Sequence, residues 1–294
     1  MGIFYGLLTA LTWGSADLLA RFATRKIGTL RTMLYMQLTG FILLTLAMRW
    51  LGGWGHLADG SGWRPWAWGI LVGLLNASGT MALYRSFEIG KMSIVAPLSA
   101  SYPVLTLLLS VLAGERLTLA RVVGMALAIV GVILVARGET LPDDANAMDT
   151  ATQPAKRRLG VAWALLAAVA FGVTFWLLGI RVVPLLGGAP TVWIIRLTSF
   201  SFAALVILMA GSSLAPPSKK DSPWILGVGI LDTSAYLLNN LGLQLEQVSV
   251  VSVLASLYGA VTVGLAALIL REPVSRLQWV GIFSIFVGII LISR

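Results

Sequence analysis

Long apolar stretches separated by short polar connections fill almost the whole sequence. A bilayer core about 30 Å thick requires roughly 20 apolar residues per helix. Ten stretches have a suitable length, at about 2–22, 30–50, 66–88, 91–113, 118–137, 158–179, 189–211, 223–246, 248–271 and 275–293. Most connections are too short to fold on their own, so neighbouring helices are expected to run antiparallel. The pattern therefore predicts an all-α membrane protein with about ten transmembrane helices.

The pattern of the first half returns in the second half. Residues 73–102 and 229–258 are similar, and a shift of 156 positions places Asn76 on Asp232. Both copies are apolar and are interrupted by a few polar side chains. The similarity indicates an internal duplication, which is common in membrane carriers.

The duplicated unit contains five helices, and Trp13 near its start aligns with Phe171 in the second copy. Because five is odd, two such units enter the membrane in opposite directions and form an inverted repeat. We expect a first repeat over 1–137, a polar linker over 138–157 and a second repeat over 158–294. Rocking of one repeat against the other would expose a shared mid-membrane site to alternate sides.

The composition supports a bilayer environment and disfavours several kinds of function. Of the 294 residues, 58% are hydrophobic and 11% are charged, which is too little charge to cover a soluble domain of this size. The net charge of +9 comes mostly from basic residues at the ends of apolar stretches, where they are typical of membrane proteins. The expected partners are therefore the lipid bilayer and a small-molecule substrate, with no nucleic acid.

No set of catalytic residues is recognised. The chain has no cysteine, which excludes disulfides and thiolate metal sites, and its single histidine, His56, lies in a Gly/Trp-rich connection. A Gly-rich phosphate loop and a carboxylate cluster with metal-binding spacing are also missing from the sequence. We therefore expect no enzyme activity, no metal site and no cofactor.

Polar side chains inside the apolar stretches are candidates for a binding site, because each is costly in hydrocarbon. Trp13 and Asp17 are four residues apart and share a helical face. Asp232 lies nine residues into an apolar stretch, which favours a function, whereas Arg21 offers Asp17 an ion pair as an alternative. Serine, threonine and asparagine also form purely structural hydrogen bonds between helices.

The predicted substrate-binding residues share inward polar or aromatic helical faces. They are Trp13, Asn76, Thr80, Tyr84, Ser99, Tyr102, Phe171, Trp176, Asp232, Tyr236, Asn239, Ser256 and Tyr258. Asp17 and Asp232 are also the candidates for proton coupling, because a desolvated carboxyl group can titrate near physiological pH.

Proline is expected to interrupt the fourth helix. Pro97 and Pro103 cannot donate backbone hydrogen bonds, so they free the carbonyls of Ser93 and Ser99 and kink or break the helix. The position equivalent to Pro103 in the ninth helix is Gly259, which also weakens a helix. Interruptions at matching places in two repeats indicate a transporter site, although proline kinks also occur in structural helices.

Glycines recur at seven-residue spacing in the last helix of each repeat, at Gly124 and Gly131 and at Gly281 and Gly288. Small residues at this spacing permit close helix packing, as a scaffold or at a dimer interface. A monomer and a homodimer are both compatible with this pattern. The acidic residues in the corners before these helices, including Glu272, are expected to cap the following helix or pair with a neighbouring arginine.

Together these features resemble the drug/metabolite transporter superfamily, in its EamA-type ten-helix branch. The resemblance rests on the duplicated five-helix unit, the WGS motif at 13–15, the proline-bearing fourth helix, the GERLT corner at 114–118 and the Gly-spaced last helices. It covers nearly the whole chain and implies an integral, multi-pass protein of a bacterial inner membrane.

The orientation of the chain has two conflicting indications. Most basic residues lie in the connections after the odd-numbered helices, for example Arg25, Lys26 and Lys219. The positive-inside rule would then place both termini outside the cytoplasm. The resemblance implies cytoplasmic termini instead, so the orientation stays open.

The resemblance implies export of amino acids, other metabolites or drugs. The mid-membrane polar groups are Asn, Asp, Ser and Tyr rather than basic residues, which disfavours a phosphorylated substrate. An aromatic, neutral-to-acidic cavity suits a small zwitterion, so we expect export of neutral or aromatic amino acids by alternating access, similar to the YddG-type exporters. The alternatives are a multidrug or cation exporter and an exporter of another non-phosphorylated metabolite.

Overall fold

The structure is a computed structural model of residues 1–294, and it describes all of them except 52–61, 115–117, 138–152, 246–247, 273 and 293–294. His56 and most of the expected linker therefore lie outside the described residues. The sixth of the ten expected membrane helices, labelled α7 in the structure, begins at Gln153 rather than at 158. The lysine and arginine residues before its apolar stretch are good helix formers, so the helix extends toward the N-terminus.

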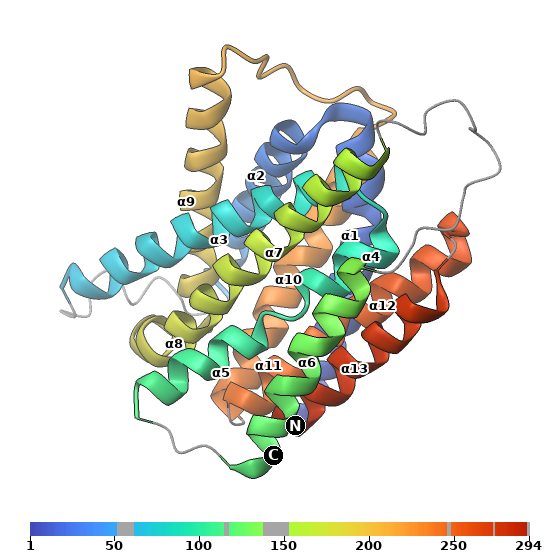
Figure 1. The fold of residues 1–294 in the computed structure, drawn as a ribbon. Helices are drawn as coiled ribbons and strands as arrows, with labels where there is room; N and C mark the ends of the chain where they lie inside the picture. The colour runs from blue at the N-terminus through green and yellow to red at the C-terminus, as the bar shows by residue number, and fades with distance from the viewer. Residues whose placement is uncertain (52–61, 115–117, 138–152, 246–247, 273, 293–294) are drawn as a thin grey trace.

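The described residues form helices and no strand (Figure 1). The helices are α1 (Gly2–Ile27), α2 (Thr29–Ala47), α3 (Arg64–Ile89), α4 (Met92–Ser99), α5 (Pro103–Leu112), α6 (Leu119–Arg137), α7 (Gln153–Leu177), η2 (Leu178–Val182), α8 (Val183–Leu186), α9 (Gly188–Met209), α10 (Ser222–Leu245), α11 (Val248–Ser256), α12 (Tyr258–Leu265), η3 (Ala266–Leu270) and α13 (Arg276–Ile292). Within the described chain these elements make up ten spans, because α4 and α5 form the fourth, α7, η2 and α8 the sixth, and α11, α12 and η3 the ninth.

The spans differ in how apolar they are. Six helical segments are both long and apolar enough to cross a membrane, and three shorter apolar helices accompany them. The helix α10 has sufficient length, but Asp232, Asn239 and Asn240 interrupt its apolar surface. The helix α10 therefore carries several polar side chains, and Asp232 and Asn239 among them are predicted site residues.

Both termini lie at the same end of the bundle (Figure 1). We call this the terminal end, where α1 begins and α13 ends, and we call the opposite end, where α1 ends and α13 begins, the far end. An even number of spans requires this arrangement.

Equivalent helices of the two halves make equivalent contacts. The helix α1 packs along α10, and α3 packs along α7. A Cβ atom added to Gly73 would lie 2.7 Å from the Cβ of Thr198, and one added to the equivalent Gly229 would lie 2.6 Å from the Cβ of Thr39. The two threonines are themselves equivalent, since they follow Leu in the similar segments LTGF and LTSF. A pseudo-twofold axis therefore relates the two halves, as an inverted repeat requires.

The last helices of the two halves, α6 and α13, pack against each other through glycine. A Cβ atom on Gly131 would lie 2.6 Å from the carbonyl oxygen of Gly281, and one on Gly288 would lie 2.5 Å from that of Gly124. The four glycines thus bring two backbones together within one chain and act as a scaffold.

Replacement of Gly131 with alanine is expected to lower the free energy of unfolding by about 1–3 kcal/mol, because the added methyl group overpacks a backbone contact. The matched control is Gly264→Ala in α12, where no atom lies within 4 Å of the added Cβ. This control should be neutral or stabilising by about 0.5–1 kcal/mol, since alanine favours helix. Thermal unfolding of the two purified variants measures the difference, and equal stabilities would contradict the packing described.

Both halves contain an interrupted span. The fourth span is broken over 100–102 and the ninth at Leu257. Pro97 lies inside α4, and Pro103 begins α5. Gly259 packs against the first break, where an added Cβ would lie 2.6 Å from the Cβ of Ala100. The two interruptions therefore meet near the pseudo-twofold axis.

Candidate functional site

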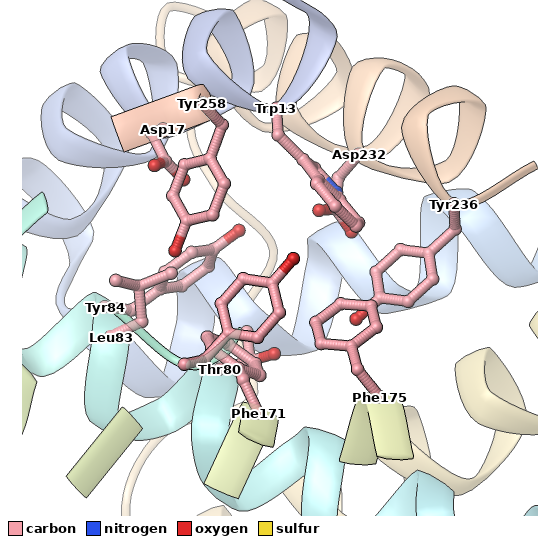
Figure 2. A pocket seen from close by; sticks show the side chains of 11 residues that line it. Trp13, Asp17, Thr80, Leu83, Tyr84, Phe171, Phe175, Asp232, Tyr236 and Tyr258 are labelled. Atoms are coloured by element: carbon pink, nitrogen blue, oxygen red, sulfur yellow. The ribbon is translucent and has the colours of Figure 1, made fainter. Parts of the chain in front are cut away.

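A cavity lies where the two halves meet, near the middle of the long helices (Figure 2). Its walls come from both repeats. The lining residues are Trp13, Asp17, Thr80, Leu83, Tyr84, Tyr102, Phe171, Phe175, Asp232, Tyr236 and Tyr258. The volume is about 40 Å³, which is room for a few water molecules. A metabolite would fit only after the walls move apart.

Aromatic rings from several helices contact one another around this cavity. The ring of Trp13 lies edge-on to those of Tyr236 and Tyr258, with centroids 5.1 and 6.0 Å apart. Phe175 stacks on Tyr102 with a centroid separation of 4.7 Å. Edge-on and stacked pairs hold the rings in defined positions, and their faces can receive a cation or an apolar side chain.

The carboxylate of Asp232 is paired with a buried arginine. Its Oδ2 lies 2.6 Å from a guanidinium nitrogen of Arg196 in α9, whose side chain is 0% exposed. The guanidinium also donates to Oε1 of Gln37 at 2.8 Å and lies 5.0 Å from the ring centroid of Tyr236. The positive charge of Arg196 balances the negative charge of Asp232. This structural partner of Asp232 was not predicted from the sequence.

The equivalent positions in the first half carry neutral amides. Gln37 precedes the LTGF segment and Arg196 precedes the LTSF segment, so the two residues are equivalent, as are Asn76 and Asp232. Asn76 Oδ1 accepts a hydrogen bond from the hydroxyl of Tyr236. One repeat thus has an ion pair where the other has two amides, and the two sets meet through the Arg196 to Gln37 hydrogen bond.

Asp17 is the second carboxylate of the cavity, and it has no cationic partner within the described part of the chain. Its Oδ2 accepts a hydrogen bond from the hydroxyl of Thr262 at 3.2 Å. The expected alternative, an ion pair between Asp17 and Arg21, is wrong because Arg21 points to Glu272, 3.1 Å away. Asp17 is therefore the acidic side chain of the cavity that no basic side chain of the described chain pairs with.

Arg21 and Glu272 connect the two halves one helical turn beyond Asp17, toward the far end. A second guanidinium nitrogen of Arg21 donates to the carbonyl oxygen of Phe87 at 2.5 Å, and Glu272 Oε2 accepts from the backbone N–H of Ser93 at 2.9 Å. Glu272 thus caps α4 rather than the following helix, and it pairs with a distant arginine rather than with a neighbour. Both parts of the expectation for this residue are wrong, because tertiary contacts at the N-terminus of α4 attract the carboxylate.

A second connection between the halves lies outside the membrane-spanning segments, at the far end. Lys26 is 3.5 Å from Asp221 and lies over the ring of Trp224 at 5.6 Å. The hydroxyl of Ser218 donates to Asp221 at 2.7 Å, and this hydrogen bond, together with Lys26, lowers the pKa of that carboxyl group. Polar contacts therefore join the two repeats at the far end.

Substitution of Glu272 with glutamine is expected to lower the free energy of unfolding by about 1.5–3 kcal/mol, because the guanidinium of Arg21 loses a charged hydrogen-bond acceptor in a buried place. The amide oxygen can still accept from the N–H of Ser93. Thermal unfolding in detergent measures the loss. The control is Asp221→Asn, which removes the more exposed ion pair with Lys26 and should change the unfolding temperature little. Equal unfolding temperatures for wild type and Glu272→Gln would contradict the contact.

The structure brings most of the predicted site residues together in the cavity wall. Five predicted residues do not line it, and these are Asn76, Ser99, Trp176, Asn239 and Ser256. Asn76 and Ser99 lie behind the wall, bonded to the hydroxyls of Tyr236 and Tyr258. Asn239 and Ser256 are buried nearby, and Trp176 packs against the core.

Four residues of the site were missed in the sequence analysis, and they are Gln37, Leu83, Phe175 and Arg196. A signal for Arg196 was present, since an arginine inside an apolar stretch is as costly as an aspartate there. Phe175 could have been found as the repeat counterpart of Asp17. Within the described residues, no group of three His, Cys, Asp or Glu side chains could hold a metal ion.

Comparison with known proteins identifies the type of molecule. The model of the EamA-like transporter family matches residues 1–137 and again 158–294. The chain belongs to the EamA-like transporter family. The resemblance to the drug/metabolite transporter superfamily is thereby confirmed, as is the all-α membrane fold of two inverted five-helix repeats. Members of this family are membrane transporters of small substrates and not enzymes, so this EamA-like transporter is an integral, multi-pass membrane protein.

Two further likenesses describe its architecture. An uncharacterized protein of Methanocaldococcus jannaschii, MJ1333.1, is 31% identical over 135 residues, which are 45% of this chain and 94% of the archaeal protein. The archaeal chain therefore has about the length of one repeat. A solved structure described only as a crystal structure of a protein has a TM-score of 0.70 and 18% sequence identity, over 99% of this chain and 96% of its own. That likeness shows the fold alone.

Proposed function

We propose that this EamA-like transporter is a carrier in a bacterial inner membrane that exports small metabolites bearing an ammonium group, with neutral or aromatic amino acids as the first candidates. The observation that supports this most strongly is Asp17, a carboxylate without a cationic partner in the described residues, placed in a cavity of aromatic rings. A carboxylate binds an ammonium group, and the ring faces add cation–π attraction. The hydroxyls of Thr80 and Tyr84 are donors for the carboxylate of an amino acid.

The two related halves support transport by alternating access as part of this proposal. The cavity lies between them, and the Arg21–Glu272 ion pair joins them at the far end. Release of substrate at that end requires this pair to separate, while release at the terminal end requires the opposite movement. Asp17 is the favoured proton-coupling residue, because the charge of Asp232 is already matched by Arg196.

An exporter of amines or organic cations is the second candidate, and one observation favours it. Arg196 is fully buried and already paired with Asp232 and Gln37. Within the described residues, a substrate carboxylate therefore meets hydroxyl donors in the cavity but no free cation. A substrate with an ammonium group and no carboxylate avoids this disadvantage.

Efflux from proteoliposomes that contain the purified protein tests both candidates. Labelled L-phenylalanine and phenethylamine share a side chain and an ammonium group, and they differ in the carboxylate. We expect saturable efflux of phenylalanine, measured with and without a proton gradient. Efflux of phenethylamine alone would establish the second candidate, and efflux of neither would reject both. Dependence on the gradient would indicate coupling to protons.

A further inference from the structure

The cavity is not placed symmetrically on the pseudo-twofold axis. Eight of its residues form four equivalent pairs from the two repeats, which are Trp13 with Phe171, Asp17 with Phe175, Thr80 with Tyr236, and Tyr102 with Tyr258. The remaining lining residues, Leu83, Tyr84 and Asp232, have counterparts that do not line the cavity. The positions of these three residues therefore show how the cavity in the present state departs from the pseudo-twofold symmetry of the two repeats.

All three unmatched lining residues are displaced toward the far end. Leu83 and Tyr84 follow Thr80 along α3, which runs from the terminal end to the far end. Asp232 precedes Tyr236 along α10, which runs in the opposite direction. The cavity in this state thus extends from the axis toward the far end.

The three counterparts are asparagines displaced toward the terminal end. Asn239 is equivalent to Leu83, Asn240 to Tyr84 and Asn76 to Asp232, each by the shift of 156 positions. Their side chains are 0–1% exposed. They form a cluster of buried positions on α3 and α10 that does not line the central cavity in this state.

Each of these asparagines has an unused hydrogen-bonding group. Both amide atoms of Asn239 lack a hydrogen-bond partner in the described chain, as do Nδ2 of Asn76 and Oδ1 of Asn240. A buried polar atom without a partner is unfavourable by about 1–3 kcal/mol. Three such amides at related positions suggest that they are satisfied in another state.

We propose that Asn76, Asn239 and Asn240 form a second substrate subsite, which lines the cavity when the carrier faces the terminal end. Exchange of the conformations of the two repeats would move each residue into the position of its counterpart. Asn239 and Asn240 would then line the cavity in place of Leu83 and Tyr84. The inference rests on the proposed carrier function and adds the chemistry of the second facing state.

The two facing states then share part of their lining and differ in the rest. In both states the carboxylate of Asp17 and the paired aromatic rings line the cavity and attract the ammonium group, whereas the three unmatched lining residues line it only toward the far end. Toward the terminal end, amide N–H groups of Asn76 and Asn239 donate to the substrate carboxylate, and amide oxygens of Asn239 and Asn240 accept from the ammonium group. Such a subsite suits a zwitterion better than an amine without a carboxylate.

Accessibility of introduced cysteines tests the subsite without any substrate. The natural sequence has no cysteine, so Leu83→Cys and Asn239→Cys are single labelling sites. In cells and in inside-out vesicles, a membrane-impermeant maleimide should label positions 83 and 239 from opposite sides of the membrane. Ile230→Cys, 48% exposed on the outer surface of α10, should not be labelled. Failure to label position 239 from either side, or labelling of both positions from the same side, would overturn the proposal.

The variant Asn239→Leu tests the role of the amide itself, because leucine is the residue that the first repeat has at this position. Flux of L-phenylalanine should fall at least about tenfold while the unfolding temperature stays equal or rises, since an unsatisfied amide has been removed. Gln244→Leu, at an exposed site of the same helix, is the matched control and should keep its flux. An unchanged flux would show that the amide is not needed for transport, and a lower unfolding temperature would show a structural role; either result would overturn the proposal. If positions 83 and 239 are labelled from opposite sides but the wild-type protein transports no phenylalanine, the proposed substrate is rejected and the second facing state is established.

Discussion

The variant Arg196→Gln is expected to lose about 3–5 kcal/mol of stability, the largest effect of any single change considered. Removal of the guanidinium leaves the carboxylate of Asp232, which is 16% exposed, without its partner in a low-dielectric environment. Breaking a buried ion pair from one side has this cost because the desolvated charge remains. Thermal unfolding and size-exclusion chromatography of the purified variant would measure the loss.

A double variant serves as the control for this prediction. Arg196→Gln combined with Asp232→Asn gives the second repeat the two amides that the first repeat already has at Gln37 and Asn76. Because no unpaired charge remains, the double variant should lie within about 1 kcal/mol of the wild type. If the double variant were as unstable as the single one, the ion pair would not be the source of the stability.

Substitution of Asp17 with asparagine is expected to raise the KM for an ammonium-bearing substrate by about 10- to 100-fold, with little effect on folding. A charge-assisted hydrogen bond contributes about 1.5–3 kcal/mol, which corresponds to this range. The asparagine oxygen still accepts from the hydroxyl of Thr262, so the wall of the cavity keeps its shape. Initial rates of phenylalanine efflux at several internal concentrations give the KM.

The control for this effect is Thr262→Val, which removes the hydrogen-bond donor and keeps the charge of Asp17. We expect a much smaller change in KM for this variant, because the ammonium group interacts with the carboxylate. Equal losses in the two variants would show that Asp17 acts by positioning Thr262, and an unchanged KM in Asp17→Asn would exclude it as the ammonium site.

The fold was predictable from the sequence because it depends on patterns that repeat along the chain. Apolar stretches of membrane length predict the spans, and the duplication with an odd number of helices predicts the inverted arrangement. The glycine spacing predicted close helix packing by α6 and α13, but not which helix each would contact or whether that helix was in the same chain. That choice depends on which helices become neighbours, which local sequence does not specify.

The charged partners could be predicted only in part. Asp232 was recognised as costly in hydrocarbon, but its partner Arg196 is 36 residues earlier and belongs to another helix. Arg21 was assigned to Asp17 because they are one turn apart, whereas the guanidinium reaches Glu272 from the other repeat. Helical periodicity shows which residues share a face, and it does not show which face of another helix lies opposite. Combining the repeat alignment with the cost of buried charge would have brought Arg196 and Gln37 to attention.

Counterflow in proteoliposomes tests the central claim, a carrier with one cavity that faces the two sides in turn. Vesicles loaded with unlabelled L-phenylalanine and diluted into labelled L-phenylalanine should accumulate label transiently above the equilibrium level. Such an overshoot arises because each outward passage of unlabelled substrate returns the binding site to the labelled side. Uptake that rises to equilibrium without an overshoot, while still exceeding that of protein-free vesicles, would indicate an open pathway and contradict the account.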